Sequence, residues 1–221
     1  MNIKFKALAV MIAILILSSG IVLFVFQTLG TKKEPSAPIR VACIGDSITF
    51  WTQYPNDLWM LLGSNYSVGN FGVGGATVTV DSGKPYVNES MFQDAKDFKP
   101  DIVIIMLGTN DANPALKPNT SSFVNNYAQL IGEFLRIASK PKVWIVKPPP
   151  IFNDGTGLST ENFDTYIIPA IEQVANVTNL PLIDVYTPLL DHSAYFKDGV
   201  HLNDYGSQAV ASIIYHALIL K

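Results

Sequence analysis

The sequence contains little of the residue chemistry that supports redox or metal centres. Its 221 residues include one cysteine and three histidines, and charged residues make up only 15%. Cys43 therefore cannot form a disulfide within the chain, and we interpret it as a small buried apolar residue. A metal-dependent hydrolase needs a denser cluster of histidine and carboxylate ligands, so we expect no metal site.

Positive charge is also scarce, which bears on the class of partner. The formal net charge is −3, and residues 1–35 contain four lysines and one glutamate, so the remaining chain carries −6. Because nucleic acids bind through basic side chains, an acidic domain of this kind argues against DNA or RNA as the main partner. The composition gives no indication of the oligomeric state.

One long uncharged segment, Ala7 to Phe26, lies near the N-terminus. About 20 apolar residues suffice for a helix to cross the hydrocarbon layer of a membrane. The candidate cleavage sequence, Thr28-Leu29-Gly30, fits a signal peptidase site poorly. We therefore favour an uncleaved signal-anchor, a transmembrane helix over residues 1–30, with a linker over residues 31–38, ahead of a cleaved signal peptide. Both interpretations place the domain outside the cytoplasm, either membrane-anchored by a single-pass helix or secreted after cleavage.

The remaining residues, 39–221, predict one α/β domain. Short apolar runs rich in β-branched residues predict buried strands, and stretches of helical pattern separate them. The predicted strands are 39–44, 66–71, 101–107, 142–146 and 182–185, and the predicted helices are 57–62, 91–98, 121–139, 163–177 (with a kink at Pro169) and 205–220. This alternation predicts a three-layer α/β/α sandwich around a five-stranded parallel sheet.

Polar or glycine-rich residues follow four of the five predicted strands. They are, in chain order, Ser47, the loop 70–75, Asn110, and the pair Asp198 and His201. Because the carboxyl ends of parallel strands meet at one edge of a sheet, we expect these residues to lie close together.

These residue types together supply the chemistry of acyl transfer. A serine hydroxyl such as that of Ser47 becomes nucleophilic when a base takes its proton, and His201 is the candidate base. Asp198, three residues earlier, can reach the other imidazole nitrogen across a turn and stabilise the imidazolium that forms. The backbone N–H of Gly75, the side-chain amide of Asn110 and the N–H of Ser47 are candidate donors to a negatively charged carbonyl oxygen.

The same residues carry a family resemblance. Four motifs occur in order: Gly45-Asp46-Ser47, Asn70-x-Gly72-x-x-Gly75, Gly108-Thr109-Asn110-Asp111 and Asp198-x-x-His201. Together they resemble the four blocks of the SGNH (GDSL) hydrolase family over about residues 39–216. The resemblance implies a flavodoxin-like sandwich that hydrolyses esters without a metal or other cofactor. It also implies that Ser47, Asp198 and His201 form a catalytic triad, and that Ser47, Gly75 and Asn110 form the oxyanion hole.

Longer stretches resemble one subgroup of that family. Residues 70–77, 100–111 and 148–152 are similar to sialate O-acetylesterase-like and other carbohydrate O-acetylesterases. This similarity implies a glycan or small-molecule ester as the substrate. We expect residues 51–54 and 152–160 to border the pocket, with Trp51 either stacking on a sugar ring or packing within the protein.

Two other functions stay open from the sequence alone. A lipase, lysophospholipase or thioesterase on the same scaffold needs an apolar trough beside Ser47 for a long acyl chain. A non-catalytic extracellular glycan-binding domain would show no esterase activity. We set an α/β-hydrolase aside, because the sequence contains no Gly-x-Ser-x-Gly motif.

Overall fold

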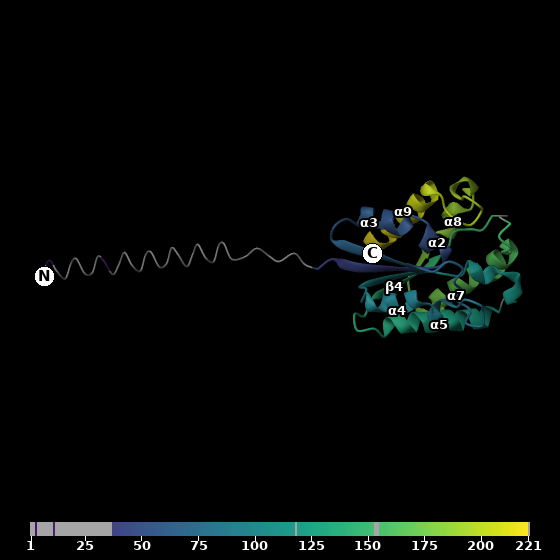
Figure 1. The fold of residues 1–221 in the computed structure, drawn as a ribbon, viewed down its shortest axis with the longest axis horizontal. Helices are drawn as coiled ribbons and strands as arrows, with labels where there is room; N and C mark the ends of the chain where they lie inside the picture. Colours follow the sequence, from purple (N-terminus) through teal and green to yellow (C-terminus); the bar gives the residue numbers. More distant parts are fainter. Residues whose placement is uncertain (1–2, 4–10, 12–36, 118, 153–154, 221) are drawn as a thin grey trace. The chain divides into compact units, whose positions relative to one another are not determined.

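The computed structural model describes residues 3, 11, 37–117, 119–152 and 155–220 (Figure 1). Residues 38–221 form one compact unit by their own contacts. No helix among the described residues is long and apolar enough to cross a membrane. Apart from residues 3 and 11, the predicted signal-anchor over residues 1–30 falls outside these residues, as does most of the predicted linker. The anchor, the linker and the location outside the cytoplasm therefore stay predictions.

The domain is built on a parallel sheet of five strands. They are β1 (Ile39–Gly45), β2 (Tyr66–Gly72), β3 (Ile102–Met106), β4 (Lys142–Lys147) and β5 (Leu182–Asp184). Their spatial order is β2-β1-β3-β4-β5, and every neighbouring pair is parallel. This is the strand order of flavodoxin-like folds, so the predicted α/β class and the predicted sheet are confirmed.

Helices cover both faces of the sheet (Figure 1). One face carries α3 (Tyr54–Leu62) and α9 (Asp204–Ile219), which pack against each other, and the other carries α4 (Ser90–Asp97), α5 (Thr120–Leu135) and α7 (Ile168–Thr178). Three short helices lie in the connections: α2 (Ser47–Trp51), α6 (Thr160–Asn162) and α8 (Tyr186–Leu189). The arrangement is therefore three-layered, with the sheet between two layers of helices.

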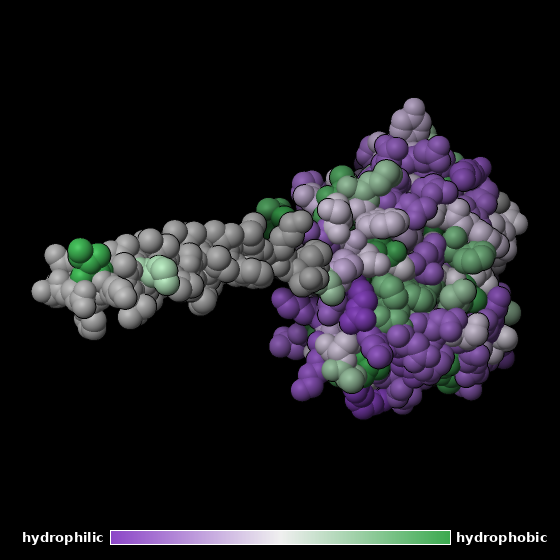
Figure 2. All heavy atoms as spheres, turned by 60° about the vertical axis from the view of Figure 1, so that its left-hand side comes forward, coloured by the Kyte–Doolittle hydropathy of each residue, from purple (hydrophilic) through white to green (hydrophobic). Residues whose placement is uncertain are grey.

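The central strands are buried on both faces because helices cover both faces. Residues 41–45 of β1 and 103–106 of β3 are all buried, which explains their continuous apolar runs. Cys43 lies among them as a free, fully buried thiol, which confirms its interpretation. On the face of the domain shown in Figure 2, hydrophilic residues dominate and apolar residues form small patches.

The segment that we expected to form one helix, 163–177, is divided in the structure. The helical structure starts three residues earlier with α6, forms a π-helical turn over Phe163–Ile167 and continues as α7. Pro169 is the second residue of α7, which directly follows the π-helical turn, so the predicted kink position coincides with a break in regular α-helical geometry. The sequence pattern also missed α2, since five residues are too few to show a helical repeat.

Candidate active site

Ser47 lies at the point where the connections of the sheet diverge. The chain leaves β1 toward β2 on one side and leaves β3 toward β4 on the other, and this divergence opens a crevice at the carboxyl edge. Ser47 is the first residue of α2, directly after that edge. Asp46 caps the helix, because its Oδ1 accepts the N–H of Ile48 at 2.9 Å. The cap fixes the turn that presents the Ser47 hydroxyl to the crevice.

His201 and Asp198 meet Ser47 from the loop before α9. Nε2 of His201 lies 2.9 Å from Oγ of Ser47, and Nδ1 lies 2.6 Å from Oδ2 of Asp198. Oδ1 of Asp198 accepts the backbone N–H groups of Val200 at 3.0 Å and of His201 at 2.7 Å. Burial disfavours the charged form of Asp198, but these hydrogen bonds outweigh it and hold its pKa below the usual range. An ionised Asp198 assigns the imidazole proton to Nδ1 and leaves Nε2 free to accept the serine proton.

The loop after β2 is tied to the helix that carries Ser47. Nδ2 of Asn70 donates to the carbonyl of Thr49 at 2.7 Å, and Oδ1 of Asn70 accepts the N–H of Gly72 at 3.0 Å. A Cβ atom on Gly72 would lie 2.4 Å from the backbone nitrogen of Phe50. Glycine is therefore required for the close approach of this loop to α2, which explains the Asn70-x-Gly72 part of the motif as packing.

Two hydrogen-bond donors reach the crevice from separate loops. Gly75 has a φ of +78°, a left-handed conformation that glycine adopts at little cost. Its N–H, like that of Ser47, donates to no other residue in the described part of the chain. Asn110 begins the short turn Asn110–Ala112 after β3, and its Nδ2 donates to the carbonyl of Ala76 at 2.9 Å. That bond orients the side chain and leaves the second amide hydrogen for a ligand.

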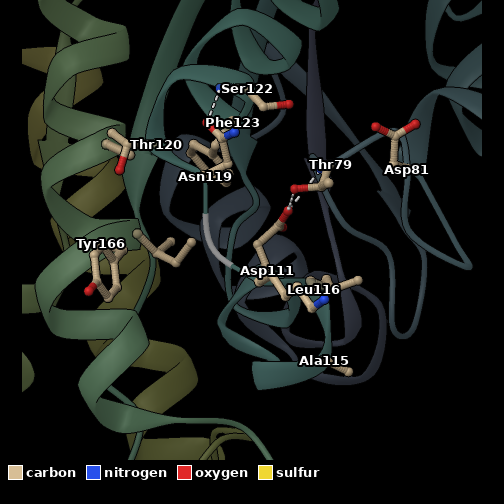
Figure 3. Close-up of a pocket in the computed structure, with 13 residues that line it drawn as sticks. Thr79, Asp81, Asp111, Ala115, Leu116, Asn119, Thr120, Ser122, Phe123 and Tyr166 are labelled. Carbon is tan, nitrogen blue, oxygen red and sulfur yellow. Dashed lines mark hydrogen bonds between the residues drawn. The ribbon is translucent and has the colours of Figure 1, made fainter.

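Asp111 holds together the two loops that carry these donors. It is buried, and its carboxylate accepts the N–H of Val78 at 2.9 Å, the N–H of Thr79 at 2.8 Å and the Thr79 hydroxyl at 2.6 Å (Figure 3). Burial raises the pKa of Asp111 to about 6, and these three hydrogen bonds oppose the rise. The position of Gly75 relative to Asn110 therefore depends on this buried carboxylate.

One cavity of about 380 Å³ brings the predicted site residues together. Ser47, Gly75, Asn110 and His201 all line it, and Asp198 stands behind His201. Its wall also contains polar and apolar side chains from the surrounding loops, namely Thr77, Ser82, Lys84, Asn113, Leu116 and Leu158. A separate cavity of about 220 Å³ beside Asp111, drawn in Figure 3, contains neither Ser47 nor His201. The larger cavity is therefore the candidate active site.

Comparison with known proteins identifies the family. Residues 43–209, most of the chain, match the model of the GDSL-like Lipase/Acylhydrolase family. The chain belongs to this family. Membership confirms the predicted resemblance to the SGNH (GDSL) hydrolases.

A curated relative of this GDSL-like acylhydrolase is also known. Acetylxylan esterase from Xylanibacter ruminicola is 34% identical over 218 residues, which cover 87% of this chain and 45% of that protein. The chain thus spans about half the length of the curated relative that it matches.

Three solved structures resemble the acylhydrolase domain. Acetyl xylan esterase AlAXEase is 24% identical with a TM-score of 0.66, over 82% of this chain and 100% of the other. A carbohydrate acetylesterase family member from Sinorhizobium meliloti is 20% identical with a TM-score of 0.63, over 82% and 97%. The aryl esterase of M. smegmatis is 19% identical with a TM-score of 0.62, over 81% and 97%. At these identities the similarity shows the fold alone.

Part of the expected pocket border is wrong. Among residues 51–54, Tyr54 is fully buried in the core, where its hydroxyl lies 2.9 Å from Oγ1 of Thr49. Trp51 is 59% exposed, and its ring meets that of His201 edge-on with 5.2 Å between centroids. The exposed ring of Trp51 therefore lies beside His201. Tyr54 instead contacts α2 from within the core, through its hydroxyl and Thr49.

The second expected border, 152–160, contributes Thr156 and Leu158 to the cavity wall. Residues 153–154 lie outside the described residues. The sequence pattern missed Lys84, which also lines the cavity. No motif contains this lysine, and only the return of the loop after β2 brings it to Gly75.

The helix cap Asp46 has an unusual environment for a carboxylate. It is 1% exposed, and its neighbours include the buried side chain of Thr109. Burial raises the pKa of Asp46 to about 7, and the negative charge of Asp111 adds to the rise, while hydrogen bonds from the Ile48 N–H and the Thr109 hydroxyl oppose it. The charged form of this cap is therefore unfavourable in the folded protein.

Replacing Asp46 with asparagine is expected to flatten the pH dependence of stability. Because the folded-state pKa lies above the ordinary value, the contribution of Asp46 to stability is full below about pH 4 and is lost as the pH rises through about 7. Asparagine keeps the capping oxygen and carries no charge, so the fall in unfolding free energy between about pH 4 and 7 should shrink by about 1 to 3 kcal/mol. Urea unfolding of both proteins across this range measures the difference. An unchanged slope would contradict the raised pKa.

Proposed function

We propose that this acylhydrolase is a serine esterase that acts through an acyl-enzyme. The observation that carries the proposal is the continuous chain of hydrogen bonds from the Ser47 hydroxyl through both nitrogens of His201 to Asp198, with lengths of 2.9 and 2.6 Å. In such a chain the imidazole takes the serine proton, and the carboxylate stabilises the imidazolium that results.

The two half-reactions use the same three side chains. Oγ of Ser47 attacks the ester carbonyl carbon while Nε2 of His201 takes the hydroxyl proton. The bond to the alcohol then breaks, and Nε2 returns the proton to the departing oxygen, which leaves the acyl group on Ser47. A water molecule gives a proton to Nε2 and attacks the acyl carbon, and collapse of this second intermediate releases the carboxylic acid and restores the serine hydroxyl.

Three donors are available for the carbonyl oxygen when it becomes negative. The N–H groups of Ser47 and Gly75 are unused within the described chain, and Asn110 holds one free amide hydrogen at the same cavity. Donors fixed before the reaction stabilise the developing charge without having to reorganise. We assign them as the oxyanion hole.

We infer that the acyl group is acetyl and that the alcohol is a carbohydrate. The 34% identity with an acetylxylan esterase supports this choice. Only three of the residues that line the cavity have larger apolar side chains, namely Leu116, Leu158 and Val200, whereas a long acyl chain needs an extended apolar trough. The exposed ring of Trp51 beside His201 is suited to stack on a sugar face.

A chain-length series tests the substrate class. We expect kcat/KM for nitrophenyl esters to fall at least about tenfold between the acetyl and octanoyl esters, because three apolar side chains in a cavity of about 380 Å³ do not form an extended trough for the longer chain. We also expect acetate release from acetylated xylo-oligosaccharides. A preference for the octanoyl ester would instead favour a lipase or thioesterase. No hydrolysis of any ester and no labelling by a fluorophosphonate would indicate a non-catalytic glycan-binding domain.

A further inference from the structure

Lys84, an exposed residue, places a permanent positive charge at the wall of the Ser47 cavity. Among the described residues that line the cavity, no other side chain carries a permanent charge. The residues after position 35 have a formal net charge of −6, so the positive charge of Lys84 is opposite in sign to the net charge of the domain. A charged group in a reaction cavity selects for or against charge on the substrate.

The backbone of Lys84 is held firmly relative to the catalytic candidates. Its carbonyl accepts the N–H of Thr77 at 3.0 Å, and its own N–H donates to Oγ of Ser82 at 3.1 Å. The residues that follow Thr77 are in turn bound by the buried carboxylate of Asp111. The backbone of Lys84, from which its side chain extends, is therefore linked by hydrogen bonds to the residues after β3.

The side chain of Lys84 extends beside the oxyanion donor Gly75. Cδ of Lys84 lies 3.9 Å from the position that a Cβ atom on Gly75 would occupy. No carboxylate among the described residues lies within 4.0 Å of the Lys84 ammonium. The side chain thus passes beside Gly75, and no carboxylate of the described chain neutralises its ammonium.

We propose that Lys84 forms an anion subsite beside the oxyanion hole. It favours acetyl esters that carry a carboxylate close to the acetylated oxygen, as in an O-acetylated sugar acid. The inference rests on the proposed esterase function and specifies its substrate. A lysine ammonium pairs with a carboxylate as a compact point charge, and its long flexible stem adapts to the position of the partner.

The test compares Lys84→Met with a matched control, Lys142→Met. Lys142 is the exposed first residue of β4, at the edge of the sheet opposite the cavity, so the control removes the same charge at a distant place. Two substrate pairs are used: an O-acetylated methyl glucuronide with the matching methyl glucoside, and 4-acetoxybenzoate with its methyl ester. Acetate release gives kcat/KM for each.

We expect Lys84→Met to lower kcat/KM about fivefold for the two acidic substrates, mainly through KM, and less than about twofold for the neutral ones. The preference of the wild-type protein for the acidic substrates should weaken as the ionic strength rises. Lys142→Met should leave all four values unchanged.

Two results would overturn the subsite. An equal loss on acidic and neutral esters would show that Lys84 acts on the oxyanion or on the position of the loop, and no loss on either would show that it has no role in selection.

The wild-type protein tests the proposed function separately. If it hydrolyses the benzoate pair but neither sugar, the carbohydrate part of the proposal fails and the benzoate pair still tests Lys84. Inactivity on all four acetates would overturn the esterase proposal and this inference with it.

Discussion

Replacing Ser47 with alanine is expected to lower kcat/KM for 4-nitrophenyl acetate by about 10⁴-fold or more. The substitution removes the attacking oxygen, which lies 2.9 Å from Nε2 of His201, and leaves the base with no hydroxyl proton to accept. The cavity and the donors from Gly75 and Asn110 remain, so a small residual rate above that of water is expected. Steady-state hydrolysis measures the loss, and a fluorophosphonate should label the wild-type protein and not the variant.

A second serine provides the matched control for this experiment. Ser121 is exposed on α5, away from the cavity, and Ser121→Ala should keep full activity and full labelling. Thermal melting of both variants shows whether the fold persists. If Ser47→Ala folds and keeps activity within about tenfold of the wild type, the acyl-enzyme on Ser47 is wrong, because loss of the nucleophile normally costs far more.

The meeting of Ser47, Asn110 and His201 was predictable because parallel strands constrain it. Once the apolar runs are assigned as strands of one parallel sheet, residues after β1, β3 and β5 must emerge at the same edge. The spacing of Asp198 and His201 likewise predicted their contact, because three residues of a turn bring a carboxylate to the imidazole. The predicted strand bounds differ from the structure by at most one residue at each end.

Other features of the site depend on contacts that no local pattern encodes. Asp111 binds Thr79 across 32 residues of sequence, and Lys84 comes close to Gly75 only because its loop folds back through Thr77. Tyr54 was expected within the pocket border 51–54, yet it is fully buried and its hydroxyl lies 2.9 Å from Oγ1 of Thr49. Such placements follow from tertiary packing, which sequence periodicity does not describe.

Asn110 gives the second prediction of large effect. Asn110→Ala is expected to lower kcat by about 10²- to 10³-fold with a small change in KM, because negative charge on the carbonyl oxygen develops only in the transition state. Asn110→Asp should be at least as damaging, because an ionised carboxylate of similar shape offers only acceptors and places a negative charge beside the oxyanion. Steady-state kinetics on the acetyl ester measure both variants, and Asn176→Ala, on an exposed position of α7, is the control.

The bond from Asn110 to the Ala76 carbonyl provides a rival explanation for any loss of activity. Its 2.9 Å hydrogen bond ties the turn after β3 to the loop that carries Gly75, so both variants also remove a structural contact. A loosened loop would misplace the substrate and lower the melting temperature, and KM would then rise together with the fall in kcat. A fall confined to kcat, in a variant that melts close to the wild type, identifies the lost donor as the cause. A change of less than about threefold in kcat would remove Asn110 from the oxyanion hole and leave the backbone N–H groups of Ser47 and Gly75 as its donors.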